Sequence, residues 1–205
     1  GDVGYYFKDR FYHRYEYDAE NKLTEVYTST DSVYWEKDAA YKYYRHGPLA
    51  RTELGQAKVQ GVDYAYTVQG WLKGINSSFT DAGKDIGGDG RLSPANGGNN
   101  LFARDAVGFS IMYNGSDYHA IGNGVAGAFV GIDKSLEGVA DHYKPLFNGN
   151  IMGTTLSFDN NLKVLGQPES NYSYAFGKTF TRLYSYDKLN RIKKSQSYTS
   201  LVGNR

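Results

Sequence analysis

The chain has no cysteine, and only four prolines, two methionines and two tryptophans stand among its 205 residues. The lack of cysteine excludes a disulfide framework and a thiolate metal site, although it does not decide the compartment. Its 23 lysines and arginines nearly balance its 22 aspartates and glutamates, so bulk charge gives no reason to expect nucleic acid as a partner. The longest nearly apolar run, residues 121–132, is too short and glycine-rich for membrane insertion, which takes about 20 residues.

The sequence is rich in tyrosine and glycine, with 20 and 25 residues respectively. Tyrosine favours strands, because its ring covers a half-buried pleated surface while its hydroxyl reaches water or a partner. Glycine favours turns. The composition therefore predicts an all-β fold with many turns. Since the chain opens Gly-Asp-Val-Gly without a signal region and ends at Gly-Asn-Arg, we expect an internal stretch of a longer polypeptide.

One pattern recurs: an aromatic residue, any residue, a second aromatic, three turn residues, Asn or Gly, any residue, and Leu or Ile. It is found at residues 15–23, 41–49, 64–72 and 184–192, and in a weaker form at residues 143–151, where Pro145 replaces the second tyrosine. The repeat residues are Tyr15, Tyr17, Asp18, Asn21, Leu23, Tyr41, Tyr43, Gly47, Leu49, Tyr64, Tyr66, Gly70, Leu72, Tyr143, Gly149, Ile151, Tyr184, Tyr186, Asp187, Asn190 and Ile192.

Each unit has the register of a β-hairpin. The two aromatics, at i and i+2, lie on one face of the incoming strand. Asp18 or Asp187 can start a type I turn through its side chain, and the Asn or Gly takes the left-handed position that closes the loop. Because an isolated hairpin is marginal in water, the hairpins should stack side by side into a curved sheet.

A glycine-rich segment interrupts the repeats and divides the chain into three parts: repeats at 1–76, an insertion within the array at 77–142, and repeats at 143–205. Within the insertion, residues 81–100 predict a long loop and residues 106–113 a strand. Residues 133–143 are the one segment that suggests a short helix. We treat the insertion as part of the array and not as a separate domain.

Three features of the sequence bear on ligand or metal binding. Residues 122–127 match the dinucleotide fingerprint by letter, but a strand-like segment follows where a helix is needed, so a flexible turn is favoured. Asp81, Asp85 and Asp89 could supply oxygen ligands to Ca²⁺, yet their spacing of four differs from the EF-hand and favours a solvated loop. The four histidines have no metal-ligand spacing; they are His13, His46, His119 and His142.

No catalytic constellation stands out, so the expectation is that the chain is not an enzyme and needs no cofactor or metal. A glycosidase pair of carboxylates stays open, because carboxylates are plentiful. A basic group near the C-terminus favours a solvated strand face that discourages edge pairing; it comprises Arg182, Lys188, Arg191, Lys193 and Lys194. Asn76, Asn114 and Asn171 precede x-Ser and would matter in a glycosylating host.

The units resemble the YD repeat of the RHS family. Residues 17–23 (Tyr-Asp-Ala-Glu-Asn-Lys-Leu) and 186–192 (Tyr-Asp-Lys-Leu-Asn-Arg-Ile) look like its Tyr-Asp-x-x-Gly/Asn-Arg-Leu signature. Residues 43–51 and 62–74 are similar to stretches of long RHS proteins of Bacteroidetes-type bacteria. The likeness covers residues 11–76 and 143–198. The Asp-Pro-x-Gly segment where the family cleaves itself is absent from this sequence.

The resemblance implies a tandem array of hairpins that forms part of a spiral β-shell. It implies a structural segment of a large secreted or cell-surface bacterial protein, whose hollow shell encloses a C-terminal, toxin-like cargo. The alternative is a surface adhesin or carbohydrate-binding scaffold without cargo, because exposed tyrosines and Trp71 can stack on sugar rings. The expected partners are flanking repeats, the cargo, and possible secretion machinery or surface glycans, without nucleic acid or membrane insertion.

Overall fold

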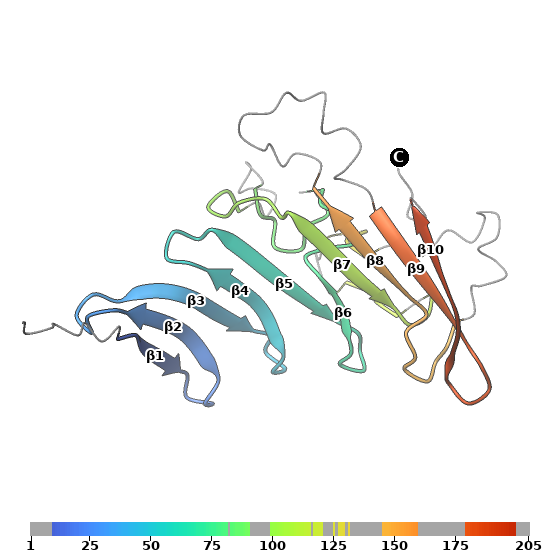
Figure 1. The fold of residues 1–205 in the computed structure, drawn as a ribbon, viewed down its shortest axis with the longest axis horizontal. Coiled ribbons are helices and arrows are strands. Elements are labelled where there is room, and N and C mark those ends of the chain that lie inside the picture. The colour runs from blue at the N-terminus through green and yellow to red at the C-terminus, as the bar shows by residue number, and fades with distance from the viewer. Residues whose placement is uncertain are drawn as a thin grey trace, which may run out of the picture. The chain divides into compact units, whose positions relative to one another are not determined.

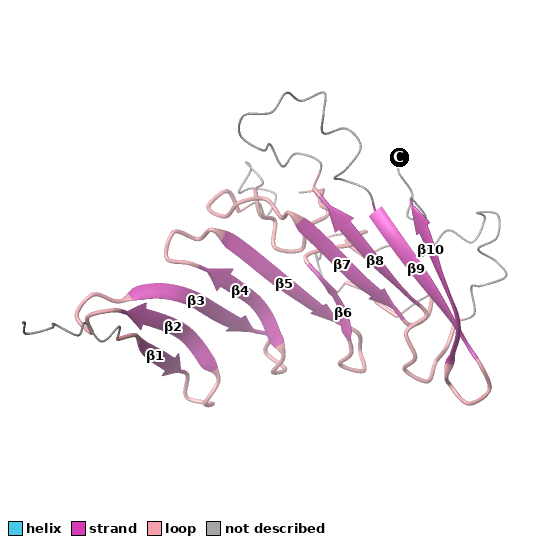
Figure 2. Ribbon diagram, in the orientation of Figure 1, coloured by secondary structure: helices cyan, strands magenta, loops and turns pink. Residues whose placement is uncertain are grey.

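The computed structural model describes residues 10–81, 83–90, 99–115, 117–120, 125, 127–129, 131, 145–159 and 179–199. These residues form ten strands and no helix (Figures 1 and 2). In the part that is described, no helix is present that could cross a membrane. The chain divides into two compact units, residues 1–61 and 62–205. The all-β prediction is confirmed.

The first unit is an antiparallel sheet of two consecutive hairpins. Its strands are β1 (Tyr12–Tyr17), β2 (Leu23–Ser29), β3 (Glu36–Tyr43) and β4 (Leu49–Leu54). Each strand pairs with the next one along the chain (Figure 1). The sheet thus consists of the hairpins of the first two repeats, joined through β2 and β3.

The second unit continues the same pattern with six strands in chain order. They are β5 (Gln60–Tyr66), most of which lies in this unit, β6 (Leu72–Ile75), β7 (Val107–Met112), β8 (Gly153–Phe158), β9 (Thr179–Tyr186) and β10 (Ile192–Thr199). Consecutive strands pair antiparallel. The strand expected at 106–113 is present as β7, whereas the helix suggested at 133–143 lies outside the described residues.

The turn of each of the five repeats is closed by a residue with positive φ. These residues are Asn21 (φ 59°), Gly47 (112°), Gly70 (82°), Gly149 (87°) and Asn190 (61°). Asparagine and glycine tolerate this region, which costs other residues free energy. The position of the chain reversal therefore follows from the sequence of each turn.

Aspartate completes two of the turns through its side chain. The Asp18 carboxylate accepts the amides of Glu20 and Lys22 at 2.8 and 2.9 Å. Asp187 accepts those of Leu189 and Arg191 at 2.8 and 3.0 Å, and these bonds and the Arg191 guanidinium lower its pKa. The same pair of hydrogen bonds at the same repeat position gives the two turns one geometry.

In four of the five repeats, the second tyrosine stands opposite the leucine or isoleucine that begins the return strand. The pairs are Tyr17 with Leu23, Tyr43 with Leu49, Tyr66 with Leu72, and Tyr186 with Ile192. The register shifts by one residue beside each of these pairs. Such a bulge increases the local twist of the strands, and it recurs at the same repeat position.

The apolar core that the structure describes is small and lies on one face of the second unit. Met112, Met152 and Leu183 are each 1% exposed and pack together. Beside them the face is polar, since Thr155 and Thr181 are buried with their hydroxyl oxygens 3.3 Å apart. Inserted residues cover this face.

Two glycines allow that close cover. A Cβ on Gly74 would lie 2.3 Å from the Phe129 ring, and one on Gly108 would lie 2.6 Å from the carbonyl oxygen of Ser77. Any larger residue at either position would push the covering segment away from the sheet. The first unit is different, because its charged side chains lie over the rings of Tyr27 and Trp35.

We predict that Asn21→Ala destabilises the chain by about 1 kcal/mol, because alanine pays for the left-handed conformation at φ 59°. Asn21→Gly should restore stability to within about 0.5 kcal/mol. Urea denaturation followed by far-UV circular dichroism measures both. If alanine and glycine gave equal stability, the turn conformation would not limit the hairpin.

Candidate functional site

At three junctions a tyrosine hydroxyl links one hairpin to the hairpin before it. Tyr43 donates to the Leu23 carbonyl at 2.8 Å, Tyr113 to that of Leu72 at 3.0 Å, and Tyr186 to that of Ile151 at 2.7 Å. The accepting residue is always the leucine or isoleucine that begins the preceding return strand. We call this contact the tyrosine staple.

The strands at these junctions pair in one register. Glu25 stands opposite Ala40, Gly74 opposite Ser110, and Gly153 opposite Leu183. In each case the first residue lies two positions after the accepting carbonyl and the second lies three positions before the tyrosine. The staple therefore coincides with a fixed alignment of consecutive hairpins.

Tyr113 is a functional residue that the sequence pattern missed. The pattern placed the fourth repeat at 143–151, with Pro145 in the second aromatic position, and Tyr143 lies outside the described residues. In the structure the incoming strand of this hairpin is β7, drawn from the segment 77–142, and Tyr113 follows it. Ile111 and Tyr113 have the i, i+2 spacing of the repeat pattern. The pattern was not recognised there because many residues separate Tyr113 from the turn that closes the hairpin.

Neighbouring turns also touch one another in the second unit. The Trp71 ring lies 5.0 Å from that of Tyr113, centroid to centroid, and an added Cβ on Gly149 would approach Trp71 to 3.1 Å. The side-chain amide groups of Asn148 and Asn150 donate hydrogen bonds to the side-chain oxygen of Asn190 at 2.9 and 3.1 Å. Trp71 is half-buried in this stack.

A buried ion pair reinforces the junction of Tyr113. Lys73 is 3% exposed, and its ammonium group lies 2.9 Å from Asp117 and 2.8 Å from the Ile111 carbonyl. The other carboxylate oxygen of Asp117 accepts the Tyr113 amide at 2.8 Å. Burial lowers the pKa of Lys73, while the hydrogen bond with Asp117 opposes that shift. Removal of one partner would leave a buried charge uncompensated.

We predict that Tyr43→Phe and Tyr186→Phe each destabilise the chain by about 1 kcal/mol, the net worth of a part-buried hydrogen bond. Each change leaves a carbonyl without its hydroxyl and keeps the ring. Tyr41→Phe is the matched control, since the Tyr41 hydroxyl makes no hydrogen bond with the described residues. Equal midpoints for all three variants in urea denaturation would show that the staple adds nothing to stability.

Four aspartates are buried together in the second unit. Carboxylate oxygens of Asp63, Asp85 and Asp89 lie within 4.8 Å of one another. These residues are 7%, 3% and 0% exposed, and Asp105 is 3% exposed. Asp105 shares a hydrogen bond with Asp85. We refer to these four residues as the aspartate cluster.

The backbone of the loop after β6 builds this cluster. Asp85 accepts the Asp89 amide at 2.7 Å and the Gly87 amide at 3.3 Å. The Asn76 side chain accepts the Asp63 amide at 2.9 Å, while its own amide donates to the Val107 carbonyl at 2.9 Å. β5, the loop and the start of β7 are thereby tied together.

The cluster holds a proton at neutral pH. Burial, reinforced by the charge and hydrogen bond of Asp85 and by the charges of Asp89 and Asp63, raises the pKa of Asp105 to about 9. A buried carboxyl among other carboxylates is cheaper to hold neutral than ionised.

The structure corrects the expectation for Asp81, Asp85 and Asp89. They do not form one ligand set in a solvated loop. Asp81 is exposed and accepts the Gly83 amide at 2.8 Å, whereas Asp85 and Asp89 are buried beside Asp63. Ca²⁺ takes six to eight oxygen ligands, of which this trio could supply only a part.

We predict that Asp105→Asn weakens the pH dependence of stability. Folding raises the pKa of Asp105 from 3.8 to about 9, so the folded chain binds one more proton between these values. The stabilisation linked to that proton is complete below pH 3.8 and is lost as pH rises through 9.

Asparagine imitates the neutral acid, so Asp105→Asn should be more stable than the parent at pH 8 by on the order of 2 kcal/mol. Urea denaturation at pH 5, 7 and 9 tests this. Asp81→Asn, on the exposed aspartate of the same loop, should leave the pH profile unchanged. Parallel pH profiles for Asp105→Asn and the parent would contradict the assignment.

A groove of about 620 Å³ runs along one face of the first unit and contains the carboxylates Glu25 and Glu53. The hydrogen bonds from Lys37 and Tyr27 lower the pKa of Glu25. Burial raises that of Glu53, but the bond and charge of Lys42 and the charge of Arg51 bring it below its usual value. A glycosidase acid needs a raised pKa, so this pair does not have that property.

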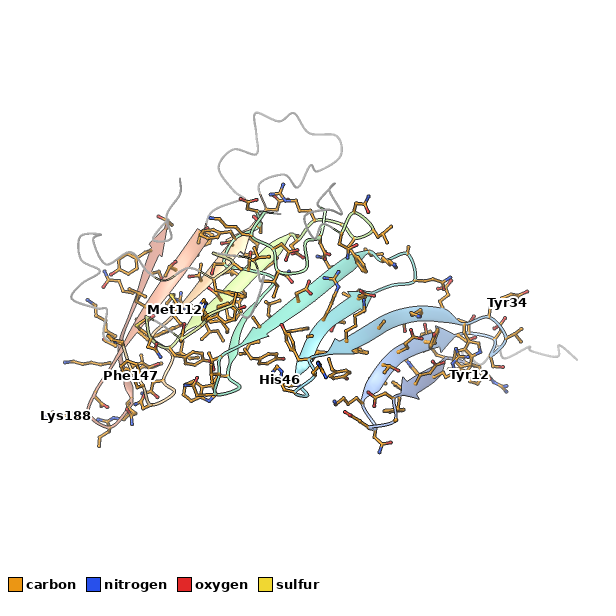
Figure 3. The ribbon with its side chains drawn as sticks, turned by 180° about the vertical axis from the view of Figure 1, so that it is seen from behind. Tyr12, Tyr34, His46, Met112, Phe147 and Lys188 are labelled. Carbon is orange, nitrogen blue, oxygen red and sulfur yellow. The ribbon has the colours of Figure 1, made fainter. Side chains whose placement is uncertain are left out.

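The remaining sequence candidates include the histidines and the Asn-x-Ser positions. His13 stacks on Tyr15 in β1, His46 lies in the turn of the second hairpin (Figure 3), and His119 is exposed. His142, Asn171 and most of residues 122–127 lie outside the described residues. Asn114 is half-buried, while Asn76 is 5% exposed and hydrogen-bonded, which leaves its side chain inaccessible to a glycosylating enzyme.

The basic group of the last hairpin is exposed. Its members Arg182, Lys188, Arg191, Lys193 and Lys194 all lie on β9, β10 or the turn between them, and Lys188 marks that turn in Figure 3. Arg191 binds Asp187 at 2.7 Å, and the Arg182 Nε donates to the Ser197 hydroxyl at 3.2 Å.

Comparison with known proteins gives a distant likeness of fold. No family model and no curated protein matches the sequence. Among solved structures, the chain is similar to a chain in the crystal structure of TcdB2-TccC3-TEV, with 14% identity and a TM-score of 0.39. The match covers 92% of this chain and 8% of that one. A TM-score this low supports no functional inference.

Proposed function

We propose that the chain is a structural segment of a large RHS-type repeat protein, and that its hairpins form part of a hollow wall around a C-terminal polypeptide of the same protein. The observation that carries this proposal is the tyrosine staple, which joins consecutive hairpins in one register at three places. A unit that attaches to its predecessor by the same contact can be repeated without limit.

The sheet itself has the properties of a wall. In the second unit, inserted residues cover one face, while the other face carries half-buried apolar side chains. Phe109, Leu156 and Phe158 lie on that face with Phe180, which is 44% exposed. Such a strip is suited to pack against an enclosed polypeptide of apolar character. The proposal places the protein outside the bacterial cell or on its surface, without a catalytic role.

The alternative function is that of a surface adhesin that binds carbohydrate. The observation that favours it is a row of exposed rings: Tyr15 and Tyr17 on β1 are 51% and 60% exposed, and Phe11, just before the strand, is 62% exposed. Trp71, the other candidate for sugar stacking, is half-buried against Tyr113. Retention on a glycan array that is lost in Tyr15→Ala would favour this alternative.

We predict that limited trypsin digestion of the full-length protein leaves a C-terminal fragment intact for as long as the repeats are folded. Intact-mass analysis identifies the fragment. The reason is steric, because a protease cannot reach a chain inside a closed wall. The control is the same C-terminal polypeptide expressed alone, which should be digested rapidly.

Two results would contradict the enclosing function. The C-terminal polypeptide expressed alone could resist trypsin, which would show that its resistance does not come from enclosure by the repeats. It could also be digested while the repeats remain intact, which would leave the repeats as a scaffold without cargo.

A further inference from the structure

The first strand of the first unit and the last strand of the second unit expose repeat positions that are half-buried in other hairpins. In β1, Tyr15 and Tyr17 are 51% and 60% exposed. The equivalent Tyr41 and Tyr43 are half-buried, and so are Tyr184 and Tyr186. In these latter hairpins the incoming strand pairs with a preceding return strand. Among the described residues, β1 pairs with β2 alone.

The last hairpin shows the reverse. Ile192 is 61% exposed, whereas Leu23, Leu72 and Ile151, whose carbonyls accept a staple, are half-buried. β1 therefore presents the tyrosine half of a junction, and β10 presents the carbonyl half. Each of these two strands carries the residues of a junction, but no described strand pairs with it on that edge.

We infer that the edge of β1 that no described strand pairs with is a docking surface for one further hairpin of the same repeat, and that the Tyr17 hydroxyl donates to the carbonyl of the leucine or isoleucine that begins its return strand. This inference rests on the repeat architecture of the proposed function and is independent of a cargo. The interface continues the one between β2 and β3.

The junction register specifies the chemistry of that hairpin. At the three junctions the residue two positions after the accepting carbonyl stands opposite the residue three positions before the tyrosine. For Tyr17 the latter residue is Arg14. A docking hairpin should therefore carry an acidic or small residue at this position, as Glu25 and Gly153 do. β10 has Lys194 there, and two like charges directly opposite destabilise a strand pair.

The first hairpin of this chain is a suitable probe. It has Leu23 as the acceptor and Glu25 two positions later. A chain in which residues 10–35 are repeated once, with Trp35 joined to a second Arg10, places the second Tyr17 twenty positions after the first Leu23. This is the spacing between Leu23 and Tyr43 in the protein. We name the first copy outer and the second copy inner.

Hydrogen exchange measured by mass spectrometry tests the docking directly. Ala19→Ser in the exposed turn of the outer copy distinguishes the peptides of the two copies. We expect the β1 amides of the inner copy to exchange at least about tenfold more slowly than those of the outer copy, because the inner strand is paired on both edges.

Tyr17→Phe provides the matched pair of variants in the same chain. In the inner copy it should lower the equilibrium constant for folding about fivefold, as expected for loss of one hydrogen bond. In the outer copy, where the hydroxyl has no hairpin to reach, the constant should change less than about twofold. Glu25→Lys in the outer copy should weaken protection of the inner β1 through repulsion of Arg14.

The inference would be overturned by equal exchange of the two β1 copies, by equal effects of the two Tyr17→Phe variants, or by failure of the duplicated chain to fold. These outcomes concern the sheet edge alone. They leave the protease test of the enclosed polypeptide unaffected, so failure of one proposal is distinguishable from failure of the other.

Discussion

A hydrogen bond from a tyrosine hydroxyl to a backbone carbonyl of the preceding hairpin is the contact on which the arrangement of the strands depends. An isolated hairpin is marginal in water, and a slip of one residue would turn every side chain to the opposite face. The staple is formed in one register, seen at Leu23, Leu72 and Ile151. It therefore both stabilises the pairing of consecutive hairpins and selects it.

Tyrosine also compensates for a small apolar core, because the described part of the sheet buries little apolar surface. Met112, Met152 and Leu183 form a small core, and much of the remaining buried face is serine and threonine. A half-buried tyrosine ring shields the sheet from water, while its hydroxyl keeps a partner. Burial raises the pKa of Tyr113 and Tyr186, which extends to more alkaline pH the range in which their hydroxyls are donors. The high tyrosine content of the chain is thus a consequence of the architecture.

The sequence predicted the turn conformations, which depend on neighbouring residues, but not the contacts between residues far apart in the chain. Asn21 and Asn190 could be assigned to left-handed positions, because a turn is determined by residues within a few positions of one another. The staple could not be predicted, since its two partners are at least twenty residues apart. For the same reason Tyr113 was overlooked, and Asp85 and Asp89 were expected in a solvated loop. Their burial depends on Asp63 in β5, which no local pattern connects to them.

Connection length has little influence on this sheet. The staple joins residues that are 20, 41 and 35 positions apart, yet the strand register at the three junctions is the same. The entropic cost of closing a loop grows only slowly with its length, so an inserted segment weakens a junction little when the staple and the ladder set the alignment. Long insertions can therefore vary in sequence while the sheet is kept. The inserted segment that packs Ser77 against Gly108 and carries Asp85 and Asp89 can therefore change in sequence without changing the register of the repeats on either side of it.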